Sequence, residues 1–176
     1  MSVAGLDAMA VEVTATFDNP IEAVWSVLSD VERMAGLGPE HYAARWDTPG
    51  PATGARFTGR NRIGDFEWEV PCLVTACRPP ELIEWTVGTA PDHSSTWSYE
   101  LRRAPGNRTV VVHRFAHGPG FSYVRQRVDA DTRAAASIIE RRSATLRSNM
   151  ETTLAAVVPL LASVPGSARE QRGPAR

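Results

Sequence analysis

Lysine is missing from this 176-residue chain, in which all 19 basic residues are arginine. Without an ε-amino group, the protein has no Schiff-base chemistry of its own. The formal net charge is −1, which gives no general reason to expect nucleic acid or an anionic membrane as a partner. Arginines on the predicted strands alternate with glutamates. The sequence therefore predicts no nucleic-acid partner and a mixed-charge surface that faces solvent.

Cysteine is scarce, with only Cys72 and Cys77 in the chain. On one strand they would lie roughly 16 Å apart and point to opposite faces, which excludes a disulfide between them. The sequence has no apolar run long enough to predict a membrane span and no N-terminal pattern typical of a signal peptide. We therefore expect a reduced, cytoplasmic protein.

Clusters of metal-binding residues are also missing. No histidines and cysteines have the spacing of a zinc site. His113 and His117 would share one strand face but lie roughly 13 Å apart. No glycine-rich phosphate loop and no serine of a nucleophile elbow is present. The sequence predicts no metal and no cofactor.

The longest pattern in the chain is a helical stripe that runs from Asp131 to about Val158. Its apolar residues recur at steps of seven, four, four, three and four, the period of one helix face. They are Ile139, Leu146, Met150, Leu154, Val157 and Leu161. We expect Asp131 to be the N-cap and Pro159 to kink or stop the helix. A helix of this length spans roughly 40 Å, so its stripe needs an equally long partner.

A series of strands with alternating apolar residues supplies that partner. The expected strands are Met9–Phe17, His41–Trp46, Arg56–Arg62, Phe66–Cys77, Leu82–Val87, Thr96–Arg102 and Thr109–His117. Turn residues of the hairpin kind separate the last five, which indicates antiparallel pairing. Two short helices are expected after the first strand, one capped by Asn19 with Pro20 at its first position and one capped by Asp30.

The predicted fold class is therefore α+β. A curved antiparallel sheet of about seven strands wraps around the long C-terminal helix, with two short helices after the first strand. We expect a single domain over residues 9–162, a flexible N-terminus over residues 1–8 and a disordered tail over residues 163–176.

Several segments carry a family resemblance. The opening reads P-x-x-x-V-W-x-x-L-x-D from Pro20 to Asp30. It is followed by Gly54-Ala-Arg-Phe57, Trp68-Glu-Val-Pro-Cys72-Leu-Val, Pro80-Glu-Leu-Ile-Glu-Trp85 and Thr96-Trp97-Ser-Tyr99-Glu-Leu101. The chain thus resembles the START-like (SRPBCC) superfamily with its helix-grip fold, and more narrowly the polyketide cyclase/dehydrase and lipid-transport family. The resemblance implies a cavity between the sheet and the long helix.

Strand alternation sorts the side chains onto two faces of the sheet. Five glutamates are expected to face outward, so no buried carboxylate pair is visible: Glu12, Glu67, Glu69, Glu84 and Glu100. The inner face is mainly aromatic, which suits a small-molecule pocket, although aromatic residues at this spacing are also typical of a packed core. The candidate ligand-binding residues are Asn61, Trp68, Cys72, Trp85, Trp97, Tyr99, His113, Phe115, Met150 and Leu154.

Three polar residues are weak candidates for catalysis. Tyr99 could hold a substrate carbonyl or bond a backbone group. His113 could act as a general base, or its ring could be satisfied by a neighbour such as Tyr99. The inward orientation of its strand is open, because both faces are partly apolar. Arg142, at the edge of the helical stripe, could reach a ligand carboxylate or keep its guanidinium in water.

The sequence leaves two functions open. The first is a carrier or sensor that binds a hydrophobic small molecule, lipid-like or polyketide-like, between sheet and helix. The second is a polyketide aromatase/cyclase or dehydratase that acts on a poly-β-keto substrate in the same cavity, as the resemblance implies. A fully packed interior would instead favour an interaction protein without a ligand. The chain could be a monomer or a homodimer.

Overall fold

The computed structural model describes residues 5–163. Seven strands precede a long C-terminal helix, with two short helices after the first strand. The strands are β1 (Ala10–Phe17), β2 (His41–Trp46), β3 (Arg56–Ile63), β4 (Phe66–Arg78), β5 (Leu82–Val87), β6 (Ser95–Ala104) and β7 (Arg108–His117). The helices are α1 (Ile21–Leu28), α2 (Val31–Met34), α3 (Tyr123–Ala130), the 3₁₀ turn η1 (Thr132–Ala134) and α4 (Ala135–Ala162).

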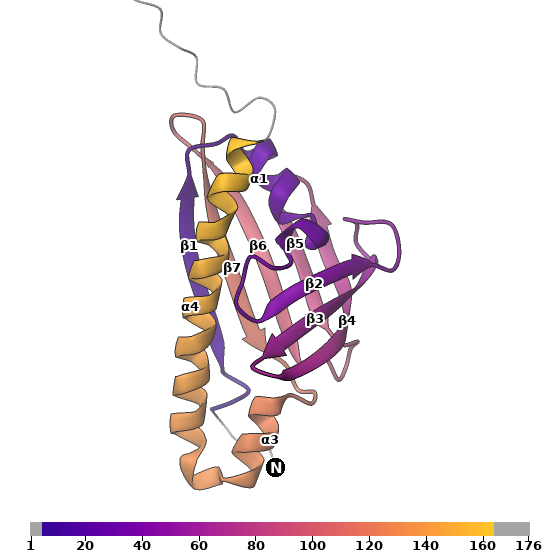
Figure 1. The fold of residues 1–176 in the computed structure, drawn as a ribbon, viewed down its shortest axis with the longest axis vertical. Coiled ribbons are helices and arrows are strands. Elements are labelled where there is room, and N and C mark those ends of the chain that lie inside the picture. Colours follow the sequence, from indigo (N-terminus) through magenta and orange to yellow (C-terminus); the bar gives the residue numbers. More distant parts are fainter. Residues whose placement is uncertain (1–4, 164–176) are drawn as a thin grey trace, which may run out of the picture.

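All seven strands form one antiparallel sheet in the order β1-β7-β6-β5-β4-β3-β2. Consecutive hairpins build it from β2 to β7, and β1 adds to the outer edge of β7. Figure 1 shows α4 running beside β1 and β7, with β2, β3 and β4 on the other side of the molecule. The predicted α+β class and the helix-grip arrangement are confirmed.

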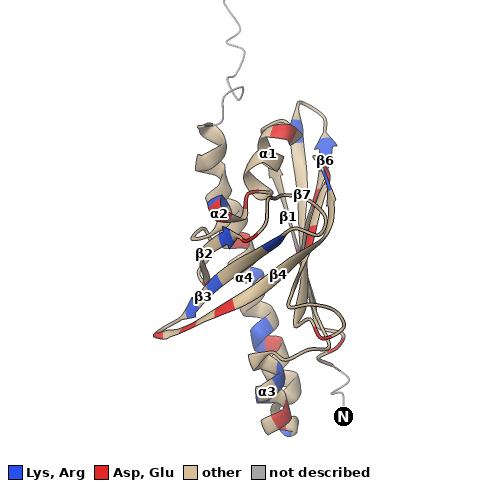
Figure 2. Ribbon diagram, turned by 90° about the vertical axis from the view of Figure 1, so that its right-hand side faces the viewer, with Lys and Arg blue, Asp and Glu red and all other residues tan. Residues whose placement is uncertain are grey.

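The long helix contacts β1, α1 and α3. Its buried residues are Ala135, Ile138, Leu146, Met150, Leu154, Val157 and Leu161. The expected stripe is therefore confirmed, except that Ile138 takes the fully buried position predicted for Ile139. The last eleven residues of α4 are uncharged, as the tan upper part of the helix shows in Figure 2.

Both expected ends of this helix need correction. Pro159 lies inside α4, which continues to Ala162. Because Pro159 is in the last turn, it removes a single backbone hydrogen bond where the helix ends anyway. The Asp131 carboxylate accepts from the backbone N–H groups of Arg133 and Ala134. It therefore caps η1, which leads into α4, and α4 itself begins without a side-chain cap.

The short helices follow the predicted pattern with one difference. Asp30 caps α2 by accepting from the backbone N–H groups of Glu32 and Arg33, as expected. The cap of α1 is Pro20 rather than Asn19, and no side chain caps this helix. Pro20 has an extended backbone with ψ of 152°, and its φ near −64° suits the entry to a helix.

A β-bulge in β4 changes which face its second half presents. Val74 pairs with Trp85 and Cys77 with Ile83, so Thr75 is an extra residue between them. Alternation restarts after the bulge. Cys77 therefore lies on the same face as Cys72, which corrects the expected opposite orientation, and both cysteines are free thiols.

The first described residues pack against the domain. Residues 5–8 form a turn in which Leu6 is fully buried. The Asp7 carboxylate pairs with Arg125 at 2.9 Å. The flexibility expected for residues 1–8 stays a prediction, and residues 1–4 and most of the expected tail, residues 164–176, lie outside the described residues. Over residues 5–163, no helix is both long and apolar enough to cross a membrane.

Candidate functional site

A cavity of about 710 Å³ lies inside the sheet, between it and the N-terminal half of α4. This volume falls in the range of small-molecule pockets. It is lined by residues from every strand but β1, from the segment that runs from α2 to the start of β2, and from α3 and α4. The wall is mainly apolar, with polar groups gathered at a few points. A fully packed interior, the third possibility raised by the sequence, is not what the protein has.

Most of the predicted ligand-binding residues line this cavity. They are Asn61, Trp68, Cys72, Trp85, Trp97, Tyr99, His113, Phe115 and Met150. Leu154 is different, because it is buried in the packed core beyond the end of the cavity. Whether the nine lining residues bind a ligand stays a prediction.

The aromatic wall follows the cross-strand pairs of the sheet. Trp97 lies opposite Phe115 and Tyr99 opposite His113 across β6 and β7. Ring contacts connect these pairs, with Trp97 and Phe115 centroids 4.8 Å apart and Trp85 and Tyr99 centroids 5.6 Å apart. Every second side chain of a strand points to the same face, and residues paired across two strands share that face. All these rings therefore lie on the cavity side of the sheet.

His113 and Tyr99 form the deepest polar pair on this wall. Their ring centroids are 4.3 Å apart, and the planes are tilted by 39°. The strand face left open by the sequence therefore points inward. His113 is not satisfied by Tyr99, since within residues 5–163 neither of its ring nitrogens has a hydrogen-bond partner. Burial lowers the pKa of the His113 imidazole to about 3 and raises the pKa of the Tyr99 phenol.

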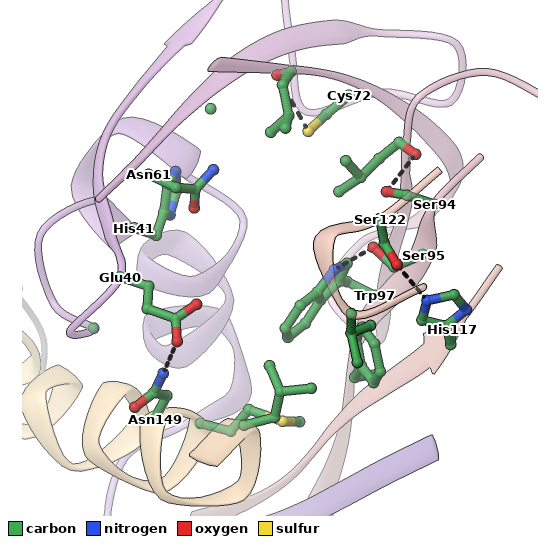
Figure 3. A pocket seen from close by; sticks show the side chains of 18 of the residues that line it. Glu40, His41, Asn61, Cys72, Ser94, Ser95, Trp97, His117, Ser122 and Asn149 are labelled. Atoms are coloured by element: carbon green, nitrogen blue, oxygen red, sulfur yellow. Dashed lines mark hydrogen bonds between the residues drawn. The ribbon is translucent and has the colours of Figure 1, made fainter. Parts of the chain in front are cut away.

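Arg142 is held by an acid that sequence reasoning missed. Its guanidinium donates two hydrogen bonds to Glu40, at 2.6 and 2.8 Å. The Asn149 amide also donates to Glu40, at 2.9 Å, and Figure 3 shows the Glu40 carboxylate pointing toward it. The guanidinium is thus partly exposed and held in an ion pair, and whether it reaches a ligand stays a prediction. Glu40 lies in the turn before β2, where no alternation reveals the direction of a side chain.

Close packing brings this turn to α4. A Cβ atom on Gly38 would lie 2.5 Å from the Thr153 hydroxyl oxygen, so any other residue here would force the Thr153 side chain to shift. A signal for Arg142 did exist in the sequence. Steps of four residues from Ile138 reach Arg142, Leu146 and Met150, which places the arginine on the buried stripe and not at its edge.

A second polar group lies on the other side of the cavity, near the start of α3. The Trp97 indole N–H donates to the Ser95 hydroxyl at 3.0 Å. His117 Nε2 and Ser122 Oγ lie 2.8 Å apart, and Figure 3 marks the contact between them with a dashed line. The same Ser122 oxygen accepts from the backbone N–H of Arg125. Ser122 is thus the N-cap of α3, and its contact with His117 fixes the start of that helix.

Aromatic residues surround the cavity where it meets solvent. Tyr123 at the start of α3 contacts Phe66 and Trp68 from the β3–β4 hairpin, with ring centroids 5.2 and 5.8 Å apart. Phe121 packs on the same tyrosine at 5.6 Å. Half of the Phe66 side chain is exposed, at the tip of the β3–β4 hairpin.

The remaining candidates have structural explanations. Burial raises the pKa of the Cys72 thiol to about 12, so at neutral pH it is an unreactive thiol. The five strand glutamates face away from the core, where arginines or Thr75 bond them. In the described part of the chain, no three His, Cys, Asp or Glu side chains are placed to hold a metal ion.

Comparison with known proteins identifies the relatives of this chain. Residues 8–151 match the family described as polyketide cyclase / dehydrase and lipid transport. Among the curated proteins, none matches the sequence.

Several solved structures share the fold. A polyketide cyclase-like protein from Corynebacterium glutamicum is 26% identical, with a TM-score of 0.64 over 88% of this chain and 92% of that one. The di-domain ARO/CYC BexL from the BE-7585A biosynthetic pathway is 17% identical, with a TM-score of 0.63 over 89% of this chain and 52% of that one. A protein from Mesorhizobium loti is 18% identical, with a TM-score of 0.59 over 87% and 96%.

Proposed function

Because the chain belongs to the polyketide cyclase / dehydrase and lipid transport family, we propose that it binds a hydrophobic small molecule, lipid-like or polyketide-like. The molecule occupies the cavity between the sheet and α4, and the protein acts as its carrier or sensor. The observation that carries this proposal is an interior cavity of about 710 Å³ with a mainly apolar, aromatic wall. Apolar surface buried on binding is the driving force expected for such a site.

The state of the ionisable groups favours binding over catalysis. An effective general base has a pKa near the working pH, whereas burial lowers the pKa of His113 to about 3. The Arg142 guanidinium, which could stabilise an enolate, already donates two hydrogen bonds to Glu40. In this state, the cavity offers shape and apolar contact more than acid–base chemistry.

A polyketide aromatase/cyclase or dehydratase is the second candidate. It is supported by the family description, by the ARO/CYC name of one structural neighbour, and by the presence of Tyr99, His113 and Arg142 in the lining of one cavity. The substitutions Tyr99→Phe and His113→Ala separate the two functions. A cyclase should lose turnover of a poly-β-keto substrate and keep its affinity, whereas a carrier should change in affinity alone.

The first test of binding is a native mass spectrum of freshly purified protein, with a denaturing run on the same sample. We expect an adduct of a few hundred daltons that is lost on denaturation. If the protein is purified empty, the neutral apolar dye N-phenyl-1-naphthylamine serves as the probe. Its emission should rise on binding, since it moves from water to an apolar site.

Two substitutions on one strand make this test specific. Asn61 lines the cavity, so Asn61→Trp should narrow it and weaken the dye signal. Arg62 is the next residue, lies on the other face and pairs with Glu67, so Arg62→Trp should leave binding unchanged. Equal dye binding by both variants would contradict the proposed cavity site.

A further inference from the structure

The connection from β7 to α3 brings a serine hydroxyl and an imidazole together beside the cavity. His117 is the last residue of β7, and Ser122 is the residue before α3. Ser122 Oγ and His117 Nε2 lie 2.8 Å apart, and both residues line the cavity (Figure 3). This distance is within the range found between a nucleophile and its general base.

The Ser122 hydroxyl is free to donate its proton to His117. Its oxygen accepts the backbone N–H of Arg125 at 3.0 Å, which occupies one of its two lone pairs. The second lone pair and the O–H proton remain. Burial, followed by the charge of the Arg125 guanidinium, lowers the pKa of His117, against smaller opposite effects of the Gly118 backbone and the Asp7 carboxylate. The imidazole is therefore mainly neutral at neutral pH and can accept a proton.

Helix capping alone does not account for this pair. Ser122 caps α3 through the backbone N–H of Arg125, and an asparagine or aspartate would cap the helix equally well. The cap needs no histidine, yet His117 is only 8% exposed, and in residues 5–163 its Nδ1 has no hydrogen-bond partner. Burial of a partly unpaired imidazole costs free energy. Proton transfer with Ser122 gives that imidazole a purpose.

The turn that carries the serine is fixed by close packing. Cβ atoms on Gly118 and Gly120 would overlap the backbone of the β5–β6 loop. The Gly120 N–H donates to the carbonyl of His93 in that loop, at 2.9 Å. The Arg125 guanidinium donates to the carbonyls of both glycines, at 3.0 and 3.1 Å. The serine and the histidine are therefore held in place before any substrate binds.

The first turn of α3 adds donors for a developing negative charge. In the described part of the chain, the backbone N–H groups of Tyr123 and Val124 make no hydrogen bond, as is usual for the first residues of a helix. Tyr123 directly follows the serine, and the residue after the nucleophile supplies an oxyanion donor in the nucleophile elbow. The dipole of α3 also favours negative charge at this end.

We propose that Ser122 and His117 are a nucleophile and its general base, which hydrolyse a carboxylic ester bound in the cavity. The Ser122 oxygen attacks the carbonyl carbon while its proton moves to His117 Nε2. The C–O bond of the ester breaks, and the departing alcohol takes the proton from Nε2. Water then attacks the acyl carbon, one of its protons passes through Nε2 to the Ser122 oxygen, and the carboxylic acid leaves.

This activity goes beyond the proposed binding function and uses the same cavity. The acyl group is apolar, because Phe115 lines the cavity two residues before His117, on the same strand face. Within residues 5–163, no acid bonds His117 Nδ1, so the pair lacks the group that orients the base in a triad. Since water attack needs the same base, we expect slow turnover and an acyl-enzyme that accumulates.

The probe is p-nitrophenyl butyrate, given to the full chain at neutral pH. We expect release of p-nitrophenol and, after rapid denaturation, a mass increase of one butyryl group, which peptide mapping places on Ser122. Ser122→Asn keeps a helix cap without the nucleophile, and His117→Gln keeps a hydrogen-bonding group without the base. Each should slow the release about 100-fold or more. The control is Ser26→Ala on α1, whose hydroxyl lies outside the cavity lining and should not matter.

Circular dichroism and urea unfolding show whether each variant keeps its fold. Where a variant does not fold, the position of the butyryl group in the wild type decides the question. No acylation, a butyryl group only on another residue, or unchanged release by both folded variants would overturn the inference. These outcomes leave the proposed function intact, which fails instead if N-phenyl-1-naphthylamine does not bind.

Discussion

The interior of this protein has two halves that use the same helix in opposite ways. In the C-terminal half of α4, Leu154, Val157 and Leu161 are at most 2% exposed and belong to the packed core. In the N-terminal half, Ile138, Arg142 and Leu146 line a cavity. Figure 1 shows α1 beside the upper end of α4 and α3 at its lower end.

The difference shows that helical periodicity decides which way a side chain points, but not how closely it is packed. Both halves follow the same steps of three and four residues. What differs is the cover, because α1 packs beside the C-terminal end of α4, while the cavity lies between the N-terminal half of α4 and the sheet (Figure 1). The packed half gives the domain its stability, so the residues that line the hollow half can vary with the ligand they bind. Four predictions test this division.

The largest effect is expected from leucine truncations on α4. Leu154 and Leu146 are equally buried, at 2% and 3% exposure, but only Leu146 lines the cavity. Leu154→Ala should lower the free energy of unfolding by about 3–5 kcal/mol. Leu146→Ala should lower it by about 2 kcal/mol or less, because one side of that leucine already lacks partner atoms. Urea unfolding measures both, and equal losses would contradict the division into two halves.

The second prediction concerns acid. The pKa of His113 in the folded protein, about 3, is below the value of roughly 6.5 in the unfolded chain. Between these two pH values, the unfolded chain binds one more proton, so stability falls as the pH decreases from 6.5 towards 3. From neutral pH to about pH 5, the wild type should lose about 2 kcal/mol more than His113→Phe. His41 and His117, whose pKa values burial also lowers, contribute equally to both proteins.

Urea unfolding of wild type and His113→Phe at the two pH values gives this difference directly. A parallel loss in both proteins would mean that the imidazole does not stay neutral in the hollow half.

An intermediate effect is expected for the ion pair at the cavity wall. Arg142 and Glu40 are 29% and 18% exposed, so solvent screens the pair in part. Arg142→Ala should cost about 1–2 kcal/mol, since it leaves the Glu40 carboxylate without its bidentate partner. The matched control is Arg45→Ala, which removes the more exposed pair with Asp47 and should cost about 0.5 kcal/mol or less. A double-mutant cycle with Glu40→Gln isolates the pair from other effects of the truncation.

The smallest effect is expected for Tyr99→Phe. The hydroxyl of this buried residue makes no hydrogen bond to the part of the chain that the structure describes. Its removal should change the free energy of unfolding by less than about 0.5 kcal/mol. A loss above about 1.5 kcal/mol in urea unfolding would show that the hydroxyl has a structural partner and belongs to the packed half of the wall.

The sequence predicted the parts of the molecule that obey a period. Alternation placed Trp97, Tyr99 and Phe115 on the inner face, and the 3.6-residue period placed Leu146 and Met150 on the buried side of the helix. These positions depend on local geometry, which is the same in every strand and helix.

Predictions from the sequence failed where a position depends on a contact between distant segments and not on the regular period of one strand or helix. Glu40 lies in a turn, so nothing local indicated that it would meet Arg142, 102 residues later in the chain. Leu154 carries the same pattern as Met150, and only the tertiary position of α1 decides which of them meets the cavity. The orientation of Cys77 depends on an extra residue in β4, which no alternation rule could indicate.

That extra residue, Thr75, has a consequence for how the length of this chain can vary. A one-residue insertion or deletion in a strand normally exchanges the two faces of everything beyond it. At the bulge the pairing is already offset by one, so removing Thr75 would keep Val74 opposite Trp85 and Cys77 opposite Ile83. The bulge in β4 is therefore an internal position of the sheet at which the chain length can change without turning the cavity residues to solvent.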